Sequence, residues 1–358
     1  MAVNYDIIVA GGGLTGVAAA IAAAREGARV LIVEQYGFLG GSACSSLVNP
    51  FMCYSVPNAD GSTHLVNDGI FTELLKRLDE LNGFHENKST FNEEILKLVL
   101  DRMVCENNVT VLFHSTITDV DVDNGTLKSL TVSNRGGKTT LTANYFLDAT
   151  GDADVAFRAG CSYQIGRNED NMCQPMTMCF RIANIDTEHF WTNWSDANDK
   201  YQQQQKEGKI KNPREDLLLF RHMSPGVIHF NSTRIIKHNP VDEWDLSRAE
   251  MAAREQVFEL FTFMKENAKG FENSTLIMSA PSIGVRESRM IEGEYKISVD
   301  DLLSCKVFED SVCCGAYGVD IHSPDGAGTT LHHIDKGRYY TIPYRALIPV
   351  TTKNLLVA

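Results

Sequence analysis

Residues 6–34 read DIIVAGGGLTGVAAAIAAAREGARVLIVE, and this stretch decides the fold. It begins with a short apolar run, Asp6–Ala10, that ends at glycines. An alanine-rich segment follows from Leu14 to Glu26, Gly27 closes it, and Arg29–Glu34 is a second apolar run. Alanine favours helix, and apolar runs bounded by glycine are typical of buried strands. The order strand, helix, strand predicts a parallel crossover unit.

The glycines between the first strand and the helix follow the pattern G-x-G-x-x-G. Gly11 allows the sharp turn, Gly13 lets a pyrophosphate approach the backbone, and Gly16 lets the helix pack closely on the strand. The first helical turn offers the N–H groups of Leu14 and Thr15 to the phosphates. The turn therefore predicts a dinucleotide ligand.

A carboxylate and a second glycine pair extend this prediction. Glu34 ends the second strand, where it would accept hydrogen bonds from the adenosine ribose and disfavour a 2′-phosphate. We assign its neighbour Gln35 to the same cofactor site. Gly40-Gly41-Ser42 would let the chain pass the diphosphate and enter the site of the flavin ring. An ordinary surface turn is the alternative for that segment.

The segment after the third predicted strand, Val109–His114, changes its period. Apolar and polar residues alternate over three short stretches, Ile117–Val122, Leu127–Asn134 and Lys138–Ala143. Tight-turn pairs separate them, which predicts three antiparallel strands. Tyr145–Ala149 then returns to an apolar run. A β-meander at this place is typical of FAD-binding folds and not of plain nicotinamide dehydrogenases.

The rest of the chain is less regular. Helices are predicted near Gly69–Leu81, Asn92–Glu106 and Trp244–Lys269, the last opened by the box Ser247-x-x-Glu250 and stopped at Gly270. Gln202–Gln205 predicts a short solvated helix at most. We expect an FAD-binding domain at 1–160, an α+β substrate or cap domain at 161–340, and a return to the first domain at 341–358.

The composition restricts the class of protein. Of 358 residues, 43% are hydrophobic and 22% charged, and 33 Lys and Arg against 46 Asp and Glu give a net charge of −13. Such a surface repels phosphate backbones, which argues against a nucleic-acid partner. The longest early apolar stretch, Leu14–Ala24, is too short to span a bilayer and follows no basic leader. A cytoplasmic protein without a membrane partner is expected.

The nine cysteines predict thiols in a reducing compartment. They form no Cys-x-x-Cys pair and no Cys/His spacing typical of zinc, so we predict no metal site. A disulfide between the adjacent Cys313 and Cys314 would be strained. Cys44 follows Gly41 closely, near the first thiol of flavin disulfide reductases, but the next cysteine is Cys53. Because a redox pair needs a closer partner, an ordinary cysteine is the favoured interpretation of Cys44.

Several motifs resemble one known family. They are DATGDAD at 148–154, GVRESR at 284–289, GEY at 293–295, GVDIH at 318–322 and IPYRALIP at 342–349. Together they resemble the FAD-dependent oxidoreductases with the glutathione-reductase-type two-dinucleotide fold, a group sometimes labelled xanthan lyases. The resemblance covers the whole chain. It implies an α/β, Rossmann-like FAD/NAD(P)-binding fold with a β-meander insertion, and FAD as the cofactor. It also implies that the turn Ala149-Thr150-Gly151 passes close to the dinucleotide, and we add Ile117 to the expected cofactor contacts.

The same resemblance raises an expectation about the C-terminal segment. In the family, the run similar to Asn354–Ala358 leads into a glycine-arginine turn and a helix near the flavin, whereas this sequence stops at Ala358. We therefore expect weakened FAD binding. We also expect uncovered apolar surface that a neighbouring chain would bury in a homo-oligomer.

Three residues are candidates for catalysis. His322, with Asp320 two residues before it, is a candidate general base or substrate donor, and the alternative is a histidine that stabilises a turn. Arg286 and Arg289 stand three residues apart, which predicts one helical face that grips a carboxylate substrate or a reduced, anionic flavin. Their alternative is ion pairing with nearby acids, namely Glu287, Glu292 or Glu294.

The predicted activity is an FAD-dependent oxidoreductase that transfers hydride between a small organic substrate and flavin N5. A nicotinamide dehydrogenase with the same glycine turn is the first alternative, and the meander and the Gly40-Gly41 loop argue against it. A flavin protein with a non-redox or RNA-modifying function is the second, and the acidic balance argues against RNA. Nothing in the sequence indicates the sugar-binding cleft of a polysaccharide lyase.

Overall fold

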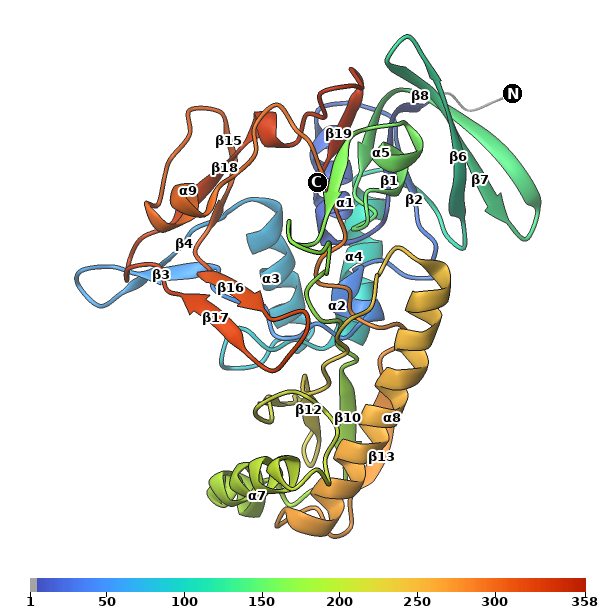
Figure 1. Ribbon diagram of the computed structural model, residues 1–358. Helices are drawn as coiled ribbons and strands as arrows, with labels where there is room; N and C mark the ends of the chain where they lie inside the picture. Colours follow the sequence, from blue (N-terminus) through green and yellow to red (C-terminus); the bar gives the residue numbers. More distant parts are fainter. Residues whose placement is uncertain (1–4) are drawn as a thin grey trace.

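The computed structural model describes residues 5–358, and its largest element is a seven-stranded sheet of order β5-β2-β1-β8-β7-β6, with β19 also paired to β8 (Figure 1). The strands are β1 (Tyr5–Ala10), β2 (Val30–Val33), β5 (Thr110–Leu112), β6 (Thr116–Asp123), β7 (Thr126–Asn134), β8 (Gly137–Asp148) and β19 (Leu355–Val357). The pairs β1–β2, β2–β5, β1–β8 and β8–β19 are parallel. The predicted α/β, Rossmann-like class is confirmed.

Both faces of this sheet are covered, because successive side chains of a strand point to opposite faces. Val9 and Ile32 belong to the core under α1 (Leu14–Arg25), α3 (Ile70–Glu80) and α4 (Glu93–Glu106). Ile8 and Leu31 belong to the opposite core, which includes residues of β6, β7 and α5 (Asp154–Arg158). Strands buried on both faces need continuous apolar runs, and this explains the sequence of β1 and β2.

The predicted division between the last meander strand and the fourth parallel strand is wrong. Instead of separate strands at 138–143 and 145–149, β8 is continuous and changes partner along its length. Ser129 pairs antiparallel with Thr142, whereas Ile7 pairs parallel with Tyr145. An extended backbone can exchange partners without a turn when one neighbouring strand ends and another begins. The predicted turn Asn124-Gly125 is confirmed, with both φ angles positive.

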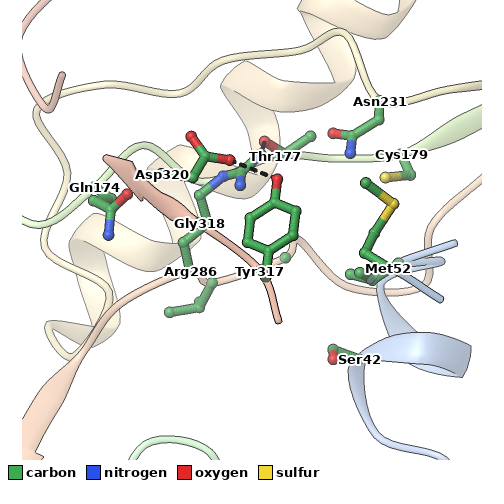
Figure 2. A pocket seen from close by; sticks show the side chains of 13 residues that line it. Ser42, Met52, Gln174, Thr177, Cys179, Asn231, Arg286, Tyr317, Gly318 and Asp320 are labelled. Atoms are coloured by element: carbon green, nitrogen blue, oxygen red, sulfur yellow. Dashed lines mark hydrogen bonds between the residues drawn. The ribbon is translucent and has the colours of Figure 1, made fainter. Parts of the chain in front are cut away.

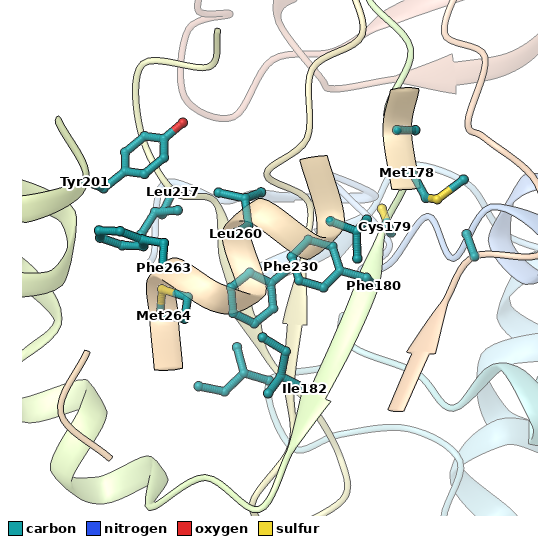
Figure 3. Packing of buried hydrophobic residues seen from close by; sticks show 14 of the residues in the cluster. Met178, Cys179, Phe180, Ile182, Tyr201, Leu217, Phe230, Leu260, Phe263 and Met264 are labelled. Carbon is teal, nitrogen blue, oxygen red and sulfur yellow. The ribbon is translucent and has the colours of Figure 1, made fainter. Parts of the chain in front are cut away.

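A second, antiparallel sheet has the order β11-β12-β10-β13. Its strands are β11 (Leu219–Arg221), β12 (Ile228–Phe230), β10 (Phe180–Ala183) and β13 (Thr275–Ser279), and its helices are α6 (Thr187–Thr192), α7 (Trp194–Lys206) and α8 (Glu243–Asn267). Phe180 and Phe230 stack at a ring distance of 4.5 Å in the core beside α8 (Figure 3). This core lies below the large sheet in Figure 1.

Two helices of this region differ from the predictions. Asp242 caps α8 through the backbone N–H of Asp245, and Ser247, predicted to cap it, donates to the carbonyl of Glu243 inside the helix. Because Asp242 also satisfies the requirement for a capping oxygen, the later box is not the start. Gln205 lies in α7, which has 13 residues, and its amide donates to two carbonyls of the following loop. The expected short solvated helix is therefore longer and partly packed.

Smaller elements complete the fold. They are α2 (Ser42–Ser45), α9 (Val299–Leu303), the 3₁₀ helix η1 (Tyr344–Ala346), and the pairs β3 (Ser55–Pro57) with β4 (Thr63–Leu65), β9 (Tyr163–Ile165) with β14 (Arg289–Ile291), β15 (Ser311–Gly315) with β18 (Tyr340–Pro343), and β16 (Val319–His322) with β17 (Thr329–His332). None of the helices between residues 5 and 358 has the length and apolar character that crossing a membrane requires.

Candidate functional site

The glycine turn between β1 and α1 shows two separate uses of glycine. A Cβ on Gly11 would lie 2.3 Å from the carbonyl oxygen of Ala149, and one on Gly16 would lie 2.0 Å from that of Gly11. Both positions exclude any side chain. Around Gly13 the nearest atom to a Cβ would be the Cα of Gly41 at 3.8 Å, so this side of the turn is accessible. The arrangement is the one predicted for the approach of a pyrophosphate.

The first turn of α1 can bind an anion. Gly13 is its N-cap residue and contributes no side-chain hydrogen bond. The first N–H groups of a helix have no partner within it, so those of Leu14 and Thr15 are available to an acceptor. The positive end of the helix dipole adds to the attraction for phosphate.

Glu34 directly follows β2 and is buried beside the turn. Its carboxylate accepts hydrogen bonds from the backbone N–H groups of Gly12, at 2.6 Å, and Tyr36, at 2.7 Å. Burial raises the pKa of Glu34, and these hydrogen bonds oppose that effect. An ionised carboxylate has about four acceptor positions, so two bonds leave capacity for ribose hydroxyls. The adjacent Gln35 is exposed.

The second glycine pair packs against the first turn. Gly40 and Gly41 both have positive φ, and the N–H of Gly40 donates to the carbonyl of Gly12 at 2.9 Å. A Cβ on Gly41 would lie 2.8 Å from the Cα of Gly13. Only glycine allows the two backbones to approach in this way. Ser42 follows at the start of α2.

The turn after β8 lies on the other side of Gly11. Asp148 is fully buried and accepts hydrogen bonds from the N–H and hydroxyl of Thr150 and from two N–H groups at the start of α5. Burial raises the pKa of Asp148. This carboxylate fixes the turn Ala149-Thr150-Gly151 next to the glycine turn. Ile117, by contrast, is buried in the core between sheet and meander.

A cavity of about 440 Å³ adjoins the Gly41 loop. Figure 2 shows its polar wall, where Arg286, Tyr317 and Asp320 converge. Segments far apart in the sequence line it: Ser42, Val48, Met52, Gln174, Thr177, Cys179, Asn231, Gly284, Val285, Arg286, Tyr317, Gly318 and Asp320. Because Ser42 is part of the lining, the cavity lies next to the second glycine pair.

Arg286 supplies positive charge to this cavity. Its Nη2 lies 3.4 Å from the hydroxyl of Thr177, and it forms no ion pair with a carboxylate of residues 5–358. Desolvation and the charge of Arg214 lower the pKa of its guanidinium, although arginine stays protonated at neutral pH. The side chain is exposed, and its charge is therefore available to an anionic ligand.

Asp320 and Tyr317 form a hydrogen-bonded pair in the cavity wall. The Tyr317 hydroxyl donates to Asp320 Oδ2 at 3.0 Å. Burial and the neighbouring carboxylate raise the pKa of Tyr317 to about 12. The other oxygen of Asp320 is 3.5 Å from Nε2 of His322. The phenol is thus a hydrogen-bond donor and the carboxylate a proton acceptor.

Arg234 contacts His322 on the side of the ring that faces away from Asp320. Arginine can only donate, so its contact of 2.7 Å with Nδ1 makes that nitrogen an acceptor and leaves the proton on Nε2, towards Asp320. Burial and the charge of Arg286 lower the pKa of His322 to about 4. The ring is therefore neutral without a free lone pair, which favours an orienting role over that of a general base. Sequence reasoning missed Arg234, whose only signal was a charge before two isoleucines.

The two predicted catalytic arginines do not share a helical face, and this prediction is wrong. No helix includes positions 284–289, and Arg289 begins β14. Its guanidinium donates to the carbonyl of Asp152, pairs with Asp154 and stacks over Phe157. Arg289 therefore supports the turn after β8, whereas Arg286 turns into the cavity.

A model of the family described as FAD dependent oxidoreductase matches residues 6–358. The chain belongs to the FAD-dependent oxidoreductase family. Its members use FAD, so the protein is an oxidoreductase enzyme with FAD as its cofactor. The two glycine segments, the buried Glu34 and the free amides of α1 fit the adenosine diphosphate half of this group. No curated protein matches the chain.

Solved structures similar to this oxidoreductase are remote in sequence. A p-nitrophenol 4-monooxygenase from Pseudomonas putida shares 12% identity over 83% of this chain and 71% of its own, with a TM-score of 0.47. A geranylgeranyl bacteriochlorophyll reductase-like protein from Thermoplasma acidophilum shares 14% identity over 78% of this chain and 66% of its own, with a TM-score of 0.47. An anhydrotetracycline hydroxylase from Streptomyces rimosus shares 13% identity over 82% of this chain and 55% of its own, with a TM-score of 0.45. The chain thus spans 55% of that hydroxylase.

Cys44 of this oxidoreductase is an ordinary buried thiol, as the sequence favoured. Its Sγ faces the carbonyl of Glu93, and burial raises its pKa to about 12. A thiolate is needed for attack on a disulfide, so Cys44 is unreactive at neutral pH. Cys313 and Cys314 are free. No group of three metal-ligating side chains converges in residues 5–358.

Proposed function

We propose that the enzyme oxidises a small organic anion in the cavity of about 440 Å³. The observation that carries this proposal is the guanidinium of Arg286, which is exposed to the cavity and lacks a carboxylate partner within residues 5–358. A cation held in a partly desolvated wall attracts a carboxylate more strongly than one on the surface. Cavities of this size hold small metabolites.

The cofactor-binding residues proposed are those of the two glycine segments and their surroundings: Gly11, Gly13, Leu14, Thr15, Gly16, Glu34, Gln35, Gly40, Gly41, Ser42, Ala149, Thr150 and Gly151. Bound FAD supplies an acceptor for the hydride that leaves the substrate carbon. The chain's residues have to bind and orient the substrate and receive its proton.

We assign the proton to the pair of Asp320 and Tyr317. A substrate hydroxyl or amine that loses hydride from its carbon also loses a proton from its oxygen or nitrogen. Asp320 accepts this proton, directly or through the Tyr317 hydroxyl that already donates to it. The Nε2–H of His322 and Arg234 behind it keep the carboxylate oriented. These two residues are positioning residues.

The test uses the FAD-loaded enzyme under anaerobic conditions and a panel of small hydroxy and amino carboxylates. Loss of the yellow flavin absorbance identifies a substrate. The substitution Arg286→Met removes a charge-assisted bond of about 1.5–3 kcal/mol, which raises KM by about 10- to 100-fold. Arg102→Met removes an exposed cation outside the cavity and is the matched control. If uncharged compounds bleach the flavin equally well in both variants, the anionic substrate is refuted.

A further inference from the structure

One face of the four-stranded sheet carries the buried polar side chains of Arg181 and His229, with Phe220 paired to His229 on the same face, and the mechanism above does not use it. Phe180 and Phe230 point into the core beside α8, so their neighbours Arg181 and His229 point to the opposite face. Arg181 and His229 are directly paired across β10 and β12. Figure 3 shows the apolar side of these strands, with β10 and Phe180 against Phe230.

This polar face begins at the cavity. Asn231 directly follows β12, and Cys179 directly precedes β10, close enough to Arg181 for its charge to act on the thiol. Both Asn231 and Cys179 line the cavity. At the other end, His222 follows β11 directly and is half-buried. The polar face therefore extends from the cavity wall to a residue that reaches the surface.

The polar atoms of this face lack partners to an unusual degree. Seven buried atoms have no hydrogen-bond partner among residues 5–358: Glu93 Oε2, Arg181 Nε and Nη2, His222 Nε2, His229 Nδ1 and Nε2, and Asn231 Oδ1. Native proteins satisfy almost all buried polar atoms with protein or ordered water. Their concentration in one place indicates internal water, because each water there finds two to four partners.

The charges of the cluster are balanced. Arg181 and Glu93 form an ion pair whose side chains are 7% and 3% exposed. The pair has no net charge, although Arg181 is the partner that disfavours protonation of the two imidazoles. Burial is the main cause that lowers the pKa of His222 to about 4 and of His229 to about 3, and Arg181 adds to both shifts. Both imidazoles are neutral at neutral pH.

His229 differs from His222 and His322 in its hydrogen bonds. His222 accepts a hydrogen bond from the N–H of Ser224 at its Nδ1, and His322 accepts one from Arg234. Both nitrogens of His229 lack a hydrogen-bond partner within the described part of the chain, residues 5–358. A neutral imidazole with water at both nitrogens takes a proton on one and releases a proton from the other.

We propose that the polar face of the four-stranded sheet is a water-filled proton path between the substrate cavity and the solvent, with His229 as its central link. This inference rests on the proposed oxidation, in which each turnover leaves one proton on Asp320. The O–H bond of Asp320 breaks and its proton moves through cavity water to the water at Asn231. One nitrogen of His229 gains a proton while the other releases one towards His222 and the solvent. No charge accumulates on the chain.

The test measures exchange of the His229 ring N–H with water, by NMR on the FAD-loaded protein carrying ¹⁵N-histidine. His229→Phe assigns the signal, and the exposed His333 gives the limit of free exchange. The path predicts exchange of His229 within about tenfold of that limit, although its side chain is buried. A protected N–H that exchanges only on local unfolding would overturn the proposal. Because no substrate is needed, failure of the proposed oxidation leaves this result unaffected.

Blocking variants test whether the path is open at both ends. Asn231→Leu closes the cavity end and His222→Phe closes the solvent end. Each alone leaves exchange fast, because water still enters from the other end, and the double variant slows it by about tenfold or more. The double variant Asn231→Ser with His222→Gln keeps polar groups at both ends and leaves exchange fast. Full slowing by a single block would overturn a continuous path, and the dispersion of the backbone amide signals of the labelled histidines confirms folding in every variant.

Discussion

The glycine turn allows a prediction in which two neighbouring substitutions have opposite effects. In Gly13→Ala the new methyl enters accessible space, since its nearest atom is 3.8 Å away. The backbone at Gly13 has φ −65° and ψ 175°, which any residue adopts. In Gly16→Ala the methyl would lie 2.0 Å from the backbone oxygen of Gly11, and no rotation of a side chain removes that contact.

The magnitudes follow from these contacts. Gly16→Ala lowers the free energy of unfolding of the FAD-free protein by about 3 kcal/mol or more, at the upper end of overpacking costs. Gly13→Ala leaves it unchanged or raises it by about 0.4–1 kcal/mol, because alanine restricts the unfolded chain. Its methyl does, however, occupy the side on which the pyrophosphate approaches. FAD affinity therefore falls by about tenfold or more, which is about 1.4 kcal/mol.

Urea unfolding of the FAD-free protein, followed by tryptophan fluorescence, measures the first quantity. Quenching of flavin fluorescence on titration with FAD measures the second. Gly27→Ala is the control, since Gly27 has positive φ with no atom near its Cβ and lies beyond the far end of α1. It costs about 1–2 kcal/mol and leaves FAD affinity unchanged. The reasoning is refuted if Gly13→Ala binds FAD as tightly as the native protein, or if Gly16→Ala is as stable.

Other substitutions and conditions give further expectations. Phe180→Ala, in the core between the four-stranded sheet and α8, lowers the free energy of unfolding in urea by about 3–5 kcal/mol. The control Phe258→Ala, at an exposed position, changes it by less than about 0.5 kcal/mol. Equal effects would contradict the packing described. A disulfide reagent labels the exposed Cys53 of the native protein rapidly and Cys44 only after unfolding, and early labelling of Cys44 would disprove its burial. Because the pKa of His322 is lowered from 6.5 to about 4, the unfolded chain binds more protons between these values, so stability falls as pH falls through this window. The slope from this ring is at most about 1.4 kcal/mol per pH unit, and His322→Gln gives a flatter unfolding curve against pH; an unchanged curve would show that this ring does not contribute.

Local signals in the chain were sufficient for the cofactor half of the protein. The glycine spacing and the buried runs of β1 and β2 specify a strand, a turn and a helix whose parts are neighbours in sequence. The meander was predicted from its alternating period and the turn pair at Asn124-Gly125. The predicted break in β8 failed because an antiparallel and a parallel partner demand the same extended backbone. Pattern along one strand contains no information on where its partner changes.

The catalytic half depended on tertiary structure. Arg286 and Arg289 belong to one short motif, and the path of the coil before β14 turns one into the cavity and the other towards Asp154. Arg234 meets His322 from 88 positions away. Contacts of this kind form when separate elements pack against each other, so no local periodicity or residue spacing predicts them.

The sequence alone therefore determined a dinucleotide fold and FAD as its cofactor, since a glycine turn and its helix are defined by backbone conformation within a few residues. Tertiary structure decided which charges face the cavity and which polar side chains share the face of one sheet. Glu93 and Arg181 illustrate the reason: neither is unusual in its own segment. Burial against each other, from two different parts of the fold, makes them a neutral pair beside His229.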